Sequence, residues 1–433
     1  MKKEVILHVG LHKTGSTSIQ LNCWRYSEQL LSAGIYYPKF SSDNWENHSV
    51  PLSLIFQDNP RAKNHTVNND YNSDASAMAA ALQMRLFLIN ELKKTIANTV
   101  LFSAEDVSNF SFEDIIKFKL LLAECGDFDF KVIIYVRHPV KFILSNAQEL
   151  VRAGEKSLSH IFELGNIQNS EIKIKNLQRI FGPECIKVYS FDEVVKDFGD
   201  VTRHFFKLIN CSHIETDQVM ANSATSIEKI LVLSAVNSLG VKYVSLLNEN
   251  LPDKGAKLSI DANIEKYLWL SCSGDVDFLK INFNITFDKK TIVASQNLTL
   301  NLNILYLNVM DSCRLLSLNG INISSLGIFE RLIRDTIVYL PEFSSLISVM
   351  AYNLHNISIF KNYILYFSAK NLLVGEFINS LYIVSDDILN SCNFNSEKYL
   401  LDNPDVVSSG IDPFRHYYVH GRFEGRFGSF YNE

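Results

Sequence analysis

The fold of this chain is decided by the stretch Val5-Ile6-Leu7-His8-Val9-Gly10-Leu11-His12-Lys13-Thr14-Gly15-Ser16-Thr17-Ser18-Ile19-Gln20. Its apolar beginning is typical of a buried strand that ends at Gly10, and a helical pattern starts after Gly15. The turn between them contains glycines and hydroxyl side chains. N–H groups at a fresh helix N-terminus point at an anion, and the helix dipole favours negative charge there. The stretch therefore predicts a phosphate-binding loop, and the alternative is a strand–turn–helix corner without a ligand.

The lysine of this loop lies in an unusual place. The Walker loop of nucleotide triphosphatases has the pattern G-x-x-x-x-G-K-[ST]. Gly10 and Gly15 have the Walker spacing, but Ser16 occupies the position of the Walker lysine, and the lysine of this chain comes earlier, at Lys13. An ordinary ATPase or GTPase loop is therefore not expected, and a Mg²⁺-dependent P-loop kinase is kept as an alternative.

The string from His8 to Ser18 resembles the 5′-phosphosulfate loop of sulfotransferases, in particular those of the bacterial carbohydrate type. The resemblance implies 3′-phosphoadenosine 5′-phosphosulfate (PAPS) as co-substrate, its 3′,5′-bisphosphate as product, and no requirement for a metal. It also implies that Lys13 neutralises charge on the oxygen that bridges to the leaving phosphate. His12 is expected to help fix the shape of the loop. The nucleotide-binding residues that the resemblance implies here are His12, Lys13, Thr14, Gly15, Ser16, Thr17 and Ser18.

A second motif supports the first. The apolar, largely β-branched run Val132–Val136 is expected of a parallel strand that is buried on both faces, and Arg137 follows at its carboxyl end. Ligands of open α/β sheets bind beyond the carboxyl ends of the strands, so both motifs open onto one edge. The spacing of Arg137 and Ser145 resembles the 3′-phosphate site of sulfotransferases, and a guanidinium suits a dianionic phosphate. The alternative for Arg137 alone is a salt-bridged surface arginine.

A hydroxyl acceptor needs a general base, and two residues are candidates. His48 lies in a polar stretch, related bacterial enzymes often carry an Asn-His pair in this neighbourhood, and imidazole has a suitable pKa. Glu105 follows the predicted strand that ends at Ser103, where the family often shows a Ser-x-Glu string. The alternatives are a surface-loop histidine and a carboxylate placed for a helix dipole. The sequence does not decide which of the two is the base.

Asn222 is a further candidate for the nucleotide site. The family often has an Asn/Ser segment in this region that approaches the nucleotide. Asn222 also precedes a helical run that begins near Ile227, and helix capping explains it equally well.

Composition limits the classes of function. The chain has 433 residues, of which 47% are hydrophobic, so two or three domains with large cores are expected. The formal net charge of −6 argues against a general nucleic-acid binder. Seven scattered cysteines without C-x-x-C spacing indicate reduced thiols and a cytoplasmic location, and no Cys/His cluster predicts a metal site. No apolar stretch is long enough for a membrane span, and the first strand leaves no room for a signal peptide before it.

Patterning predicts several regions. Alternating strand and helix signals over about 1–245 predict an α/β domain with a parallel central sheet between two helical layers, and the resemblance makes this a P-loop-like sulfotransferase domain. Residues 41–76 are polar and are expected to form a long loop. Apolar and polar residues alternate over 250–325, which predicts a β-rich, sandwich-like accessory unit with either a sugar-binding or a structural role. Residues 326–390 are expected to be mostly helical.

The segment 391–433 resembles a short tail module of bacterial enzymes that build surface polysaccharides. His416, His420 and Arg426 mimic a catalytic cluster, but a compact helical module with stacked aromatic residues is favoured. The tail implies a role in capsule or lipopolysaccharide synthesis, with other enzymes of that synthesis as candidate partners.

Together the motifs predict transfer of a sulfonate group from PAPS to a hydroxyl or amine of a carbohydrate. The alternatives are the kinase and a degenerate sulfotransferase fold that serves as a glycan-binding scaffold. The sequence names neither the acceptor glycan, nor the sulfated position, nor the oligomeric state.

Overall fold

The computed structural model describes residues 2–40, 46–163, 168–217, 225–240, 243–255, 257–258, 262–288, 302–321 and 396–409, with single positions between 323 and 332. The chain divides into two compact units, and each is built from separate stretches of sequence. We call the first the sheet unit; it comprises Met1–Asn146, Ile167–Ser223 and Leu268–Thr291. The second unit comprises Ala147–Asn166, Ala224–Tyr267 and Ile292–Glu433.

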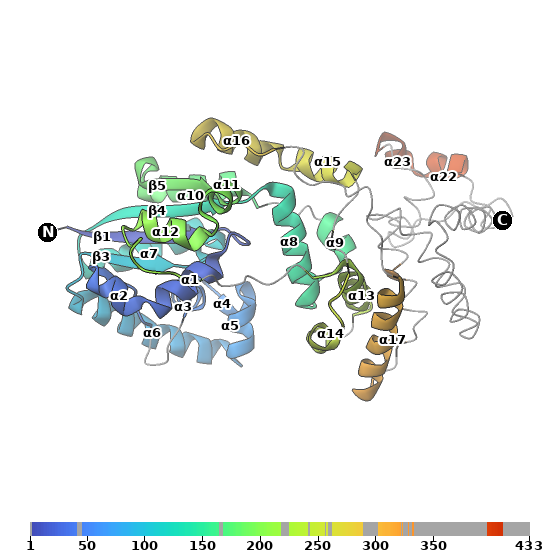
Figure 1. Ribbon diagram of the computed structural model, residues 1–433, viewed down its shortest axis with the longest axis horizontal. Coiled ribbons are helices and arrows are strands. Elements are labelled where there is room, and N and C mark those ends of the chain that lie inside the picture. Colours follow the sequence, from blue (N-terminus) through green and yellow to red (C-terminus); the bar gives the residue numbers. More distant parts are fainter. Residues whose placement is uncertain are drawn as a thin grey trace. The chain divides into compact units, whose positions relative to one another are not determined.

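A five-stranded parallel sheet forms the centre of the sheet unit, as predicted (Figure 1). The strand order is β2-β3-β1-β4-β5, so the strand that precedes the glycine loop lies in the middle. Its neighbours on both sides end near the same edge, since Gly10 pairs with Tyr135 and His8 pairs with Ser103. The strands are β1 (Lys3–Gly10), β2 (Ile35–Tyr36), β3 (Thr99–Ser103), β4 (Phe128–Val136) and β5 (Ile186–Ser190).

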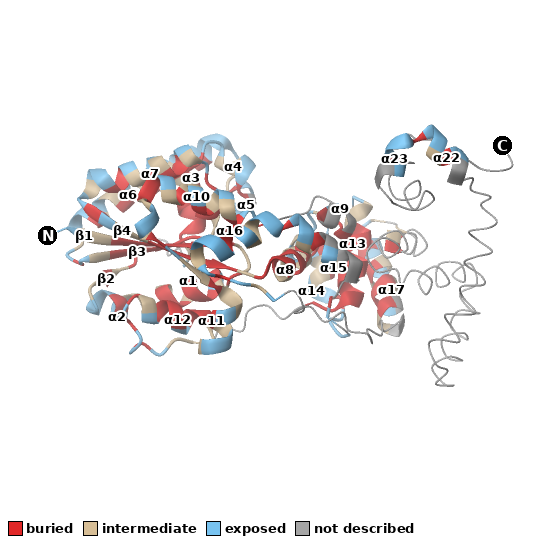
Figure 2. Ribbon diagram, turned by 90° about the horizontal axis from the view of Figure 1, so that it is seen from above, coloured by how far each residue is buried: buried red, intermediate tan, exposed pale blue. Residues whose placement is uncertain are grey.

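Alternate residues of the strands enter cores on opposite faces of the sheet. Val5, Leu7 and Val9 belong to one core, whereas Ile6 and Ile133 belong to the other. This period of two follows from the pleat, and burial of both faces explains the continuous apolar runs in the sequence. Figure 2 shows the two helical layers on either side of the sheet.

The helices divide between these two faces. The first face is covered mainly by α3 (Ser49–Phe56), α5 (His65–Asp70), α6 (Asp74–Lys94), α7 (Phe112–Cys125), α10 (Ser170–Phe181) and α16 (Ser273–Phe283). The second face is covered by α1 (Ser16–Arg25), α2 (Ser27–Ser32), α11 (Phe191–Phe198) and α12 (Val201–Leu208). Short elements of this unit are α4 (Pro60–Lys63) and the 3₁₀ turns Asp106–Asn109 and Pro183–Cys185.

The described part of the second unit is helical. α13 (Ile227–Ser238) is buried along most of its length and packs against α14 (Val244–Asn250) and α17 (Leu302–Leu318). The remaining helices are α9 (Leu158–Glu163), α22 (Ser396–Asp402) and α23 (Pro404–Ser409), while α8 (Pro139–Arg152) and α15 (Ala262–Ser271) have residues in both units.

The prediction of a β-rich accessory unit over 250–325 is wrong for the residues that the structure describes. Most of these residues form α15, α16 and α17, and the isolated bridge of Lys257 with Ser226 is the one β pairing among the described residues of this region. The physical reason is visible in α17, whose Leu305, Val309, Ser312 and Leu316 are all buried. Steps of three and four residues place one face of a helix against a core, and in a short run this spacing overlaps with strand-like alternation.

The prediction of a long loop over 41–76 is also wrong for its described part, which contains α3, α4, α5 and the start of α6. Asn64 Oδ1 accepts a hydrogen bond from the Val67 N–H at 3.2 Å, and Ser73 Oγ accepts one from the Ser76 N–H at 3.2 Å. These polar residues cap helices, and so the composition that suggested a loop marks helix starts instead.

The compact units do not follow the expected boundary near residue 245, because Leu268–Thr291 joins the sheet unit while Ala147–Asn166 does not. Nearly all of 326–390, and the tail from residue 410 with its His416, His420 and Arg426, lie outside the described residues. Within the described part of the chain, no helix combines the length and apolar character that a membrane crossing demands. The six described cysteines are free thiols.

Candidate functional site

The loop between β1 and α1 depends on its two glycines. A side chain at Gly10 would place its Cβ 1.8 Å from Ser16 Oγ, and one at Gly15 would lie 2.6 Å from Val201 Cγ1. Lys13 and Gly15 both have left-handed backbones, with φ values of 67° and 78°. This conformation is open to glycine but costly for other residues, so the strain at Lys13 makes the loop a candidate functional feature.

The N-terminus of α1 offers free donors to an anion. The first helical hydrogen bond is donated by the Ile19 N–H to the Gly15 carbonyl at 3.2 Å. No described group accepts a hydrogen bond from the N–H groups of Ser16, Thr17 or Ser18. The first turn also contains no acidic residue. Because these N–H groups lie at the positive end of the helix dipole, they can bind a phosphate.

The hydroxyl groups of the loop differ from their predicted role. The side chains of Thr14, Ser16 and Ser18 are buried, and Thr14 Oγ1 donates to the Leu11 carbonyl at 2.5 Å. Thr17 alone among the four predicted hydroxyl residues is exposed. Thr14 therefore helps to hold the loop, whereas Ser16 Oγ is buried without a partner among the described residues, and Thr17 is the hydroxyl residue most open to an anion.

Arg137 lies beside this loop, as the second motif predicted. Its guanidinium donates to the Lys13 carbonyl at 3.1 Å and lies 5.4 Å from the centre of the Phe191 ring. Arg137 makes no ion pair with any described carboxylate, and its Nε is buried without a described partner. The alternative of a salt-bridged surface arginine thus fails for the described residues.

Asp192, the acidic group whose charge acts on Arg137, is engaged by other partners. Asp192 forms an ion pair with Lys141 at 2.8 Å and accepts a hydrogen bond from the His138 N–H at 2.8 Å. Burial lowers the pKa of Arg137 from its usual value, and the charge of Asp192 partly opposes this. A guanidinium keeps its charge even so, and an incompletely paired cation at the strand edge fits a phosphate ligand.

The structure gives less support to the other two residues that were predicted to bind the nucleotide, Ser145 and Asn222. Ser145 lies about two turns into α8, is partly exposed and makes no hydrogen bond with a described residue. Asn222 lies outside the described residues.

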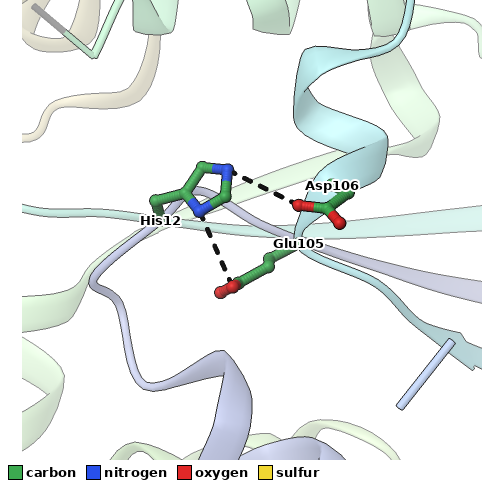
Figure 3. Close-up of side chains that lie close together, drawn as sticks. All are labelled: His12, Glu105 and Asp106. Carbon is green, nitrogen blue, oxygen red and sulfur yellow. Dashed lines mark ion pairs between the residues drawn. The ribbon is translucent and has the colours of Figure 1, made fainter. Parts of the chain in front are cut away.

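Glu105 and Asp106 follow β3 and meet His12 of the neighbouring loop. His12 Nδ1 lies 3.6 Å from Glu105 Oε1, and His12 Nε2 lies 3.8 Å from Asp106 Oδ1 (Figure 3). Figure 3 shows the imidazole between the two carboxylates. Asn109 Nδ2 lies 2.8 Å from His12 Nε2, which orients the Nδ1 side of the ring toward Glu105.

Protonation in this cluster is coupled. Burial lowers the pKa of His12, but the hydrogen bond and charge of Glu105 together with the charge of Asp106 outweigh it, so the pKa is raised overall. Burial raises the pKa of Glu105, but the hydrogen bond and charge of His12 and the charge of Lys13 outweigh it, so the pKa is lowered. Glu105 is therefore an ionised carboxylate, as a proton acceptor must be before transfer.

Sequence reasoning missed the pairing of His12 with Glu105 and assigned His12 to the shape of the loop and to nucleotide binding. A signal was present, because β1 and β3 were both expected in one parallel sheet and the two residues come just after these strands. Neighbouring parallel strands place such residues at one edge.

His48 does not fit the role of a general base. Its Nε2 donates to the Pro38 carbonyl at 3.0 Å, and its Nδ1 accepts from the Ser103 N–H at 3.3 Å. The ring is fully buried and stacks on Tyr37 with a centroid distance of 3.9 Å. Burial lowers the pKa of His48 to about 3, with the Pro38 bond partly opposing it. Both nitrogens are engaged with backbone groups, so His48 stabilises the fold.

The cluster has one further chemical property. His12, Glu105 and Asp106 present potential metal-ligand atoms within 4.8 Å of one another, although the sequence predicted no metal site. The ion pairs of His12 with both carboxylates account for the closeness without an ion.

No protein-family model matches the chain, and no curated protein matches it. Two solved structures show similarity. The sulfotransferase from Alicyclobacillus acidocaldarius is 15% identical with a TM-score of 0.36, and the match covers 66% of this chain and 98% of that one. The sulfotransferase domain from the curacin biosynthetic pathway is 13% identical with a TM-score of 0.27, covering 75% and 99%.

Proposed function

We propose that this protein is a sulfotransferase that moves a sulfonate group from PAPS to a hydroxyl or amine of a carbohydrate. One observation carries the proposal: Arg137 has no carboxylate partner among the described residues and is hydrogen-bonded to the glycine loop. The helix after this loop begins with N–H groups that no described group accepts. Two anion sites thus lie side by side at one edge of the sheet. A nucleotide with phosphates at both its 5′ and 3′ positions matches such a pair.

The residues have distinct roles in this proposal. The N–H groups that begin α1, together with Lys13 and Thr17, hold the 5′-phosphosulfate, and Arg137 with Ser145 holds the 3′-phosphate. In this proposal Asn222 also contacts the nucleotide. Sulfonate transfer resembles phosphoryl transfer, in which catalysis consists mainly of positioning and charge stabilisation. Lys13 neutralises the charge that develops on the leaving phosphate, and this scheme requires no metal.

Glu105 accepts the proton of the acceptor hydroxyl. It is ionised, half-buried and paired with His12 at the edge where the loop lies. His12 is a positioning residue, because its imidazole holds the carboxylate in place and keeps it ionised. His48 has no part in the step.

The biological setting belongs to the same proposal. The tail resemblance supports a capsule or lipopolysaccharide glycan as acceptor and other enzymes of that synthesis as partners. The free cysteines support a cytoplasmic site of action.

Calorimetric titration of the full chain tests the proposal. The 3′,5′-bisphosphate of adenosine is titrated in the absence of metal, and ATP is titrated with Mg²⁺, against wild type, Arg137→Ala and Arg85→Ala. Arg85 is a matched control because it pairs with Glu124 on the helical surface formed by α6 and α7. We expect metal-independent bisphosphate binding that weakens at least about tenfold only in Arg137→Ala, since charge-assisted hydrogen bonds are lost. Preference for ATP with Mg²⁺ would establish the kinase instead. Bisphosphate binding without sulfonate transfer to any glycan would favour the glycan-binding scaffold over the enzyme.

A further inference from the structure

A pocket of about 260 Å³ lies in the sheet unit between the segment that follows β3 and the start of α10. Its volume is below the ~300–1,000 Å³ that is usual for drug-sized ligands, so it suits a single ring. The polar residues that line it are Ser108, Asn109, Asn169, Lys173 and Asn176, and Phe110 is among its apolar residues.

Among the described residues that line this pocket, Lys173 is the one cation. Its ammonium group donates to Asn109 Oδ1 at 2.9 Å and makes no ion pair with a described carboxylate. The acidic group that influences it, Asp275, already accepts hydrogen bonds from the N–H groups of Ser170 at 2.7 Å and Glu171 at 3.1 Å. Burial lowers the pKa of Lys173 to about 8, with the charge of Asp275 opposing this. A partly buried cation without a direct counter-charge favours an anionic ligand.

The remaining polar groups of the pocket suit hydroxyl groups. Ser108 is buried, and its Oγ has no partner among the described residues. The amides of Asn169 and Asn176 add donors and acceptors, while Phe110 supplies apolar surface. A sugar ring has the matching character, with hydroxyl groups at its edge and C–H groups on its faces.

Asn109 connects this pocket to the proposed catalytic cluster. One end of its amide accepts from Lys173, and the other lies 2.8 Å from His12 Nε2. A ring in the pocket is thus separated by one side chain from the imidazole that pairs with Glu105. The positive charge of Lys173 partly offsets the negative charge of Glu105 for an approaching anion.

We propose that this pocket binds the acceptor, and that Lys173 selects a sugar ring that carries a carboxylate, as in a uronic acid. The inference rests on the proposed function for the reaction and deepens it by naming the substrate class. Lys173 is then a specificity-determining residue, with Asn109 as the link between acceptor recognition and the proton acceptor.

Two matched sugars test the proposal: methyl glucuronide, and methyl glucoside, which lacks the carboxylate. Their binding to the full chain is measured by calorimetry with the adenosine 3′,5′-bisphosphate present. We expect wild type to bind the glucuronide about tenfold more tightly, as one charge-assisted hydrogen bond allows. Lys173→Met should lose this preference, and Lys173→Arg should keep most of it. Lys175→Met, an exposed lysine on the same helix that pairs with Glu171, should behave as wild type.

A second readout uses unaltered protein. NMR titration of the lysine ammonium groups should show that the glucuronide raises the pKa of Lys173, because a bound carboxylate stabilises the charged form. Equal binding of the two sugars, binding of neither, or a preference that survives in Lys173→Met would overturn the proposal. Nucleotide binding, measured in the same titrations, tests the proposed function separately. If the nucleotide binds but the two sugars bind equally, only the uronic-acid inference is overturned. If the glucuronide is preferred but the nucleotide does not bind, only the sulfotransferase proposal is overturned.

Discussion

At the scale of single residues, Glu105 and His12 set each other's protonation. Removing the imidazole in His12→Gln leaves burial, which raises the pKa of Glu105, opposed chiefly by the charge of Lys13. We expect the Glu105 pKa, followed by carbon-detected NMR, to rise in His12→Gln. The acid limb of the activity profile should move to higher pH by the same amount, because only the ionised carboxylate accepts a proton.

The control for this prediction is His213→Gln, which removes an exposed histidine of the sheet unit. It should leave the Glu105 pKa unchanged. An unaltered Glu105 pKa in His12→Gln would show that the 3.6 Å approach of the two groups has no electrostatic consequence.

The buried position of His48 leads to a prediction about the pH dependence of stability. An unfolded imidazole binds a proton near pH 6.5, whereas the folded one does so only at about 3. The unfolded state therefore gains protons first, and the native state loses stability as pH falls from 6.5 toward 3. The loss is up to about 1.4 kcal/mol per pH unit for each such histidine. In His48→Gln the free energy of unfolding in urea should depend less steeply on pH by this amount.

The glutamine variant keeps a donor for the Pro38 carbonyl and an acceptor for the Ser103 N–H. Nucleotide binding should persist in His48→Gln, since His48 has no part in the proposed sulfonate transfer. A pH dependence equal to that of wild type would mean that His48 titrates normally in the folded protein.

Residue chemistry could be predicted where it is tied to a motif. Gly10 and Arg137 lie at strand ends, which continuous apolar runs define well in the sequence, and Gly15 lies where the helical pattern begins. The interior position of His48 could not be predicted, because it depends on Tyr37 and Ser103 closing over the ring from other segments. Solvent access is a tertiary property that local composition does not carry.

At the scale of elements, the proposed role of the α1 N-terminus as an anion site can be tested by placing a negative charge in its first turn. Thr17 is exposed in the first turn, where a carboxylate interacts favourably with the helix dipole. We expect Thr17→Glu to stabilise the fold by about 0.5 kcal/mol and at the same time to weaken binding of the bisphosphate by about tenfold or more, through occupation of the anion site and repulsion. Urea unfolding and calorimetry measure the two effects.

Thr17→Gln is the matched control, because it has nearly the same shape without the charge. Its loss of nucleotide affinity should be much smaller than that of Thr17→Glu, because it changes the Thr17 contact without adding a negative charge. Tighter nucleotide binding in Thr17→Glu would place the phosphate elsewhere and remove α1 from the site.

Element type was predictable for the parallel sheet and unreliable for short amphipathic runs. β1 and β4 are buried on both faces, so no other element type competes with their long apolar runs. In α3 and α17 the apolar residues alternate with Ser and Asn, and the contacts that make these segments helical come from distant elements. In these segments the local sequence pattern does not indicate a helix, and tertiary packing determines the element type.

At the scale of the whole molecule, the segment Leu268–Thr291 is part of the sheet unit despite its distance along the chain. Leu279 of α16 is buried in the same core as β1, whereas Leu270 is exposed. We expect Leu279→Ala to lower the free energy of unfolding by about 2–5 kcal/mol and Leu270→Ala to change it by less than about 0.5 kcal/mol. Equal small costs in urea unfolding would show that α16 is not part of this core.

The carboxylate of Asp275 that closes the start of α10 has a consequence for biosynthesis. It reaches back to Ser170 and Glu171 from roughly a hundred residues downstream, in a segment that completes the first face of the sheet. A ribosome must therefore synthesise about two thirds of the chain before this face can close. Domains usually fold in order as they emerge, but here pieces of the second unit emerge between pieces of the first. Until then the part of this core that α16 covers, around Phe278 and Leu279, lacks its last helix, and a nascent chain in this state offers an apolar surface to chaperones.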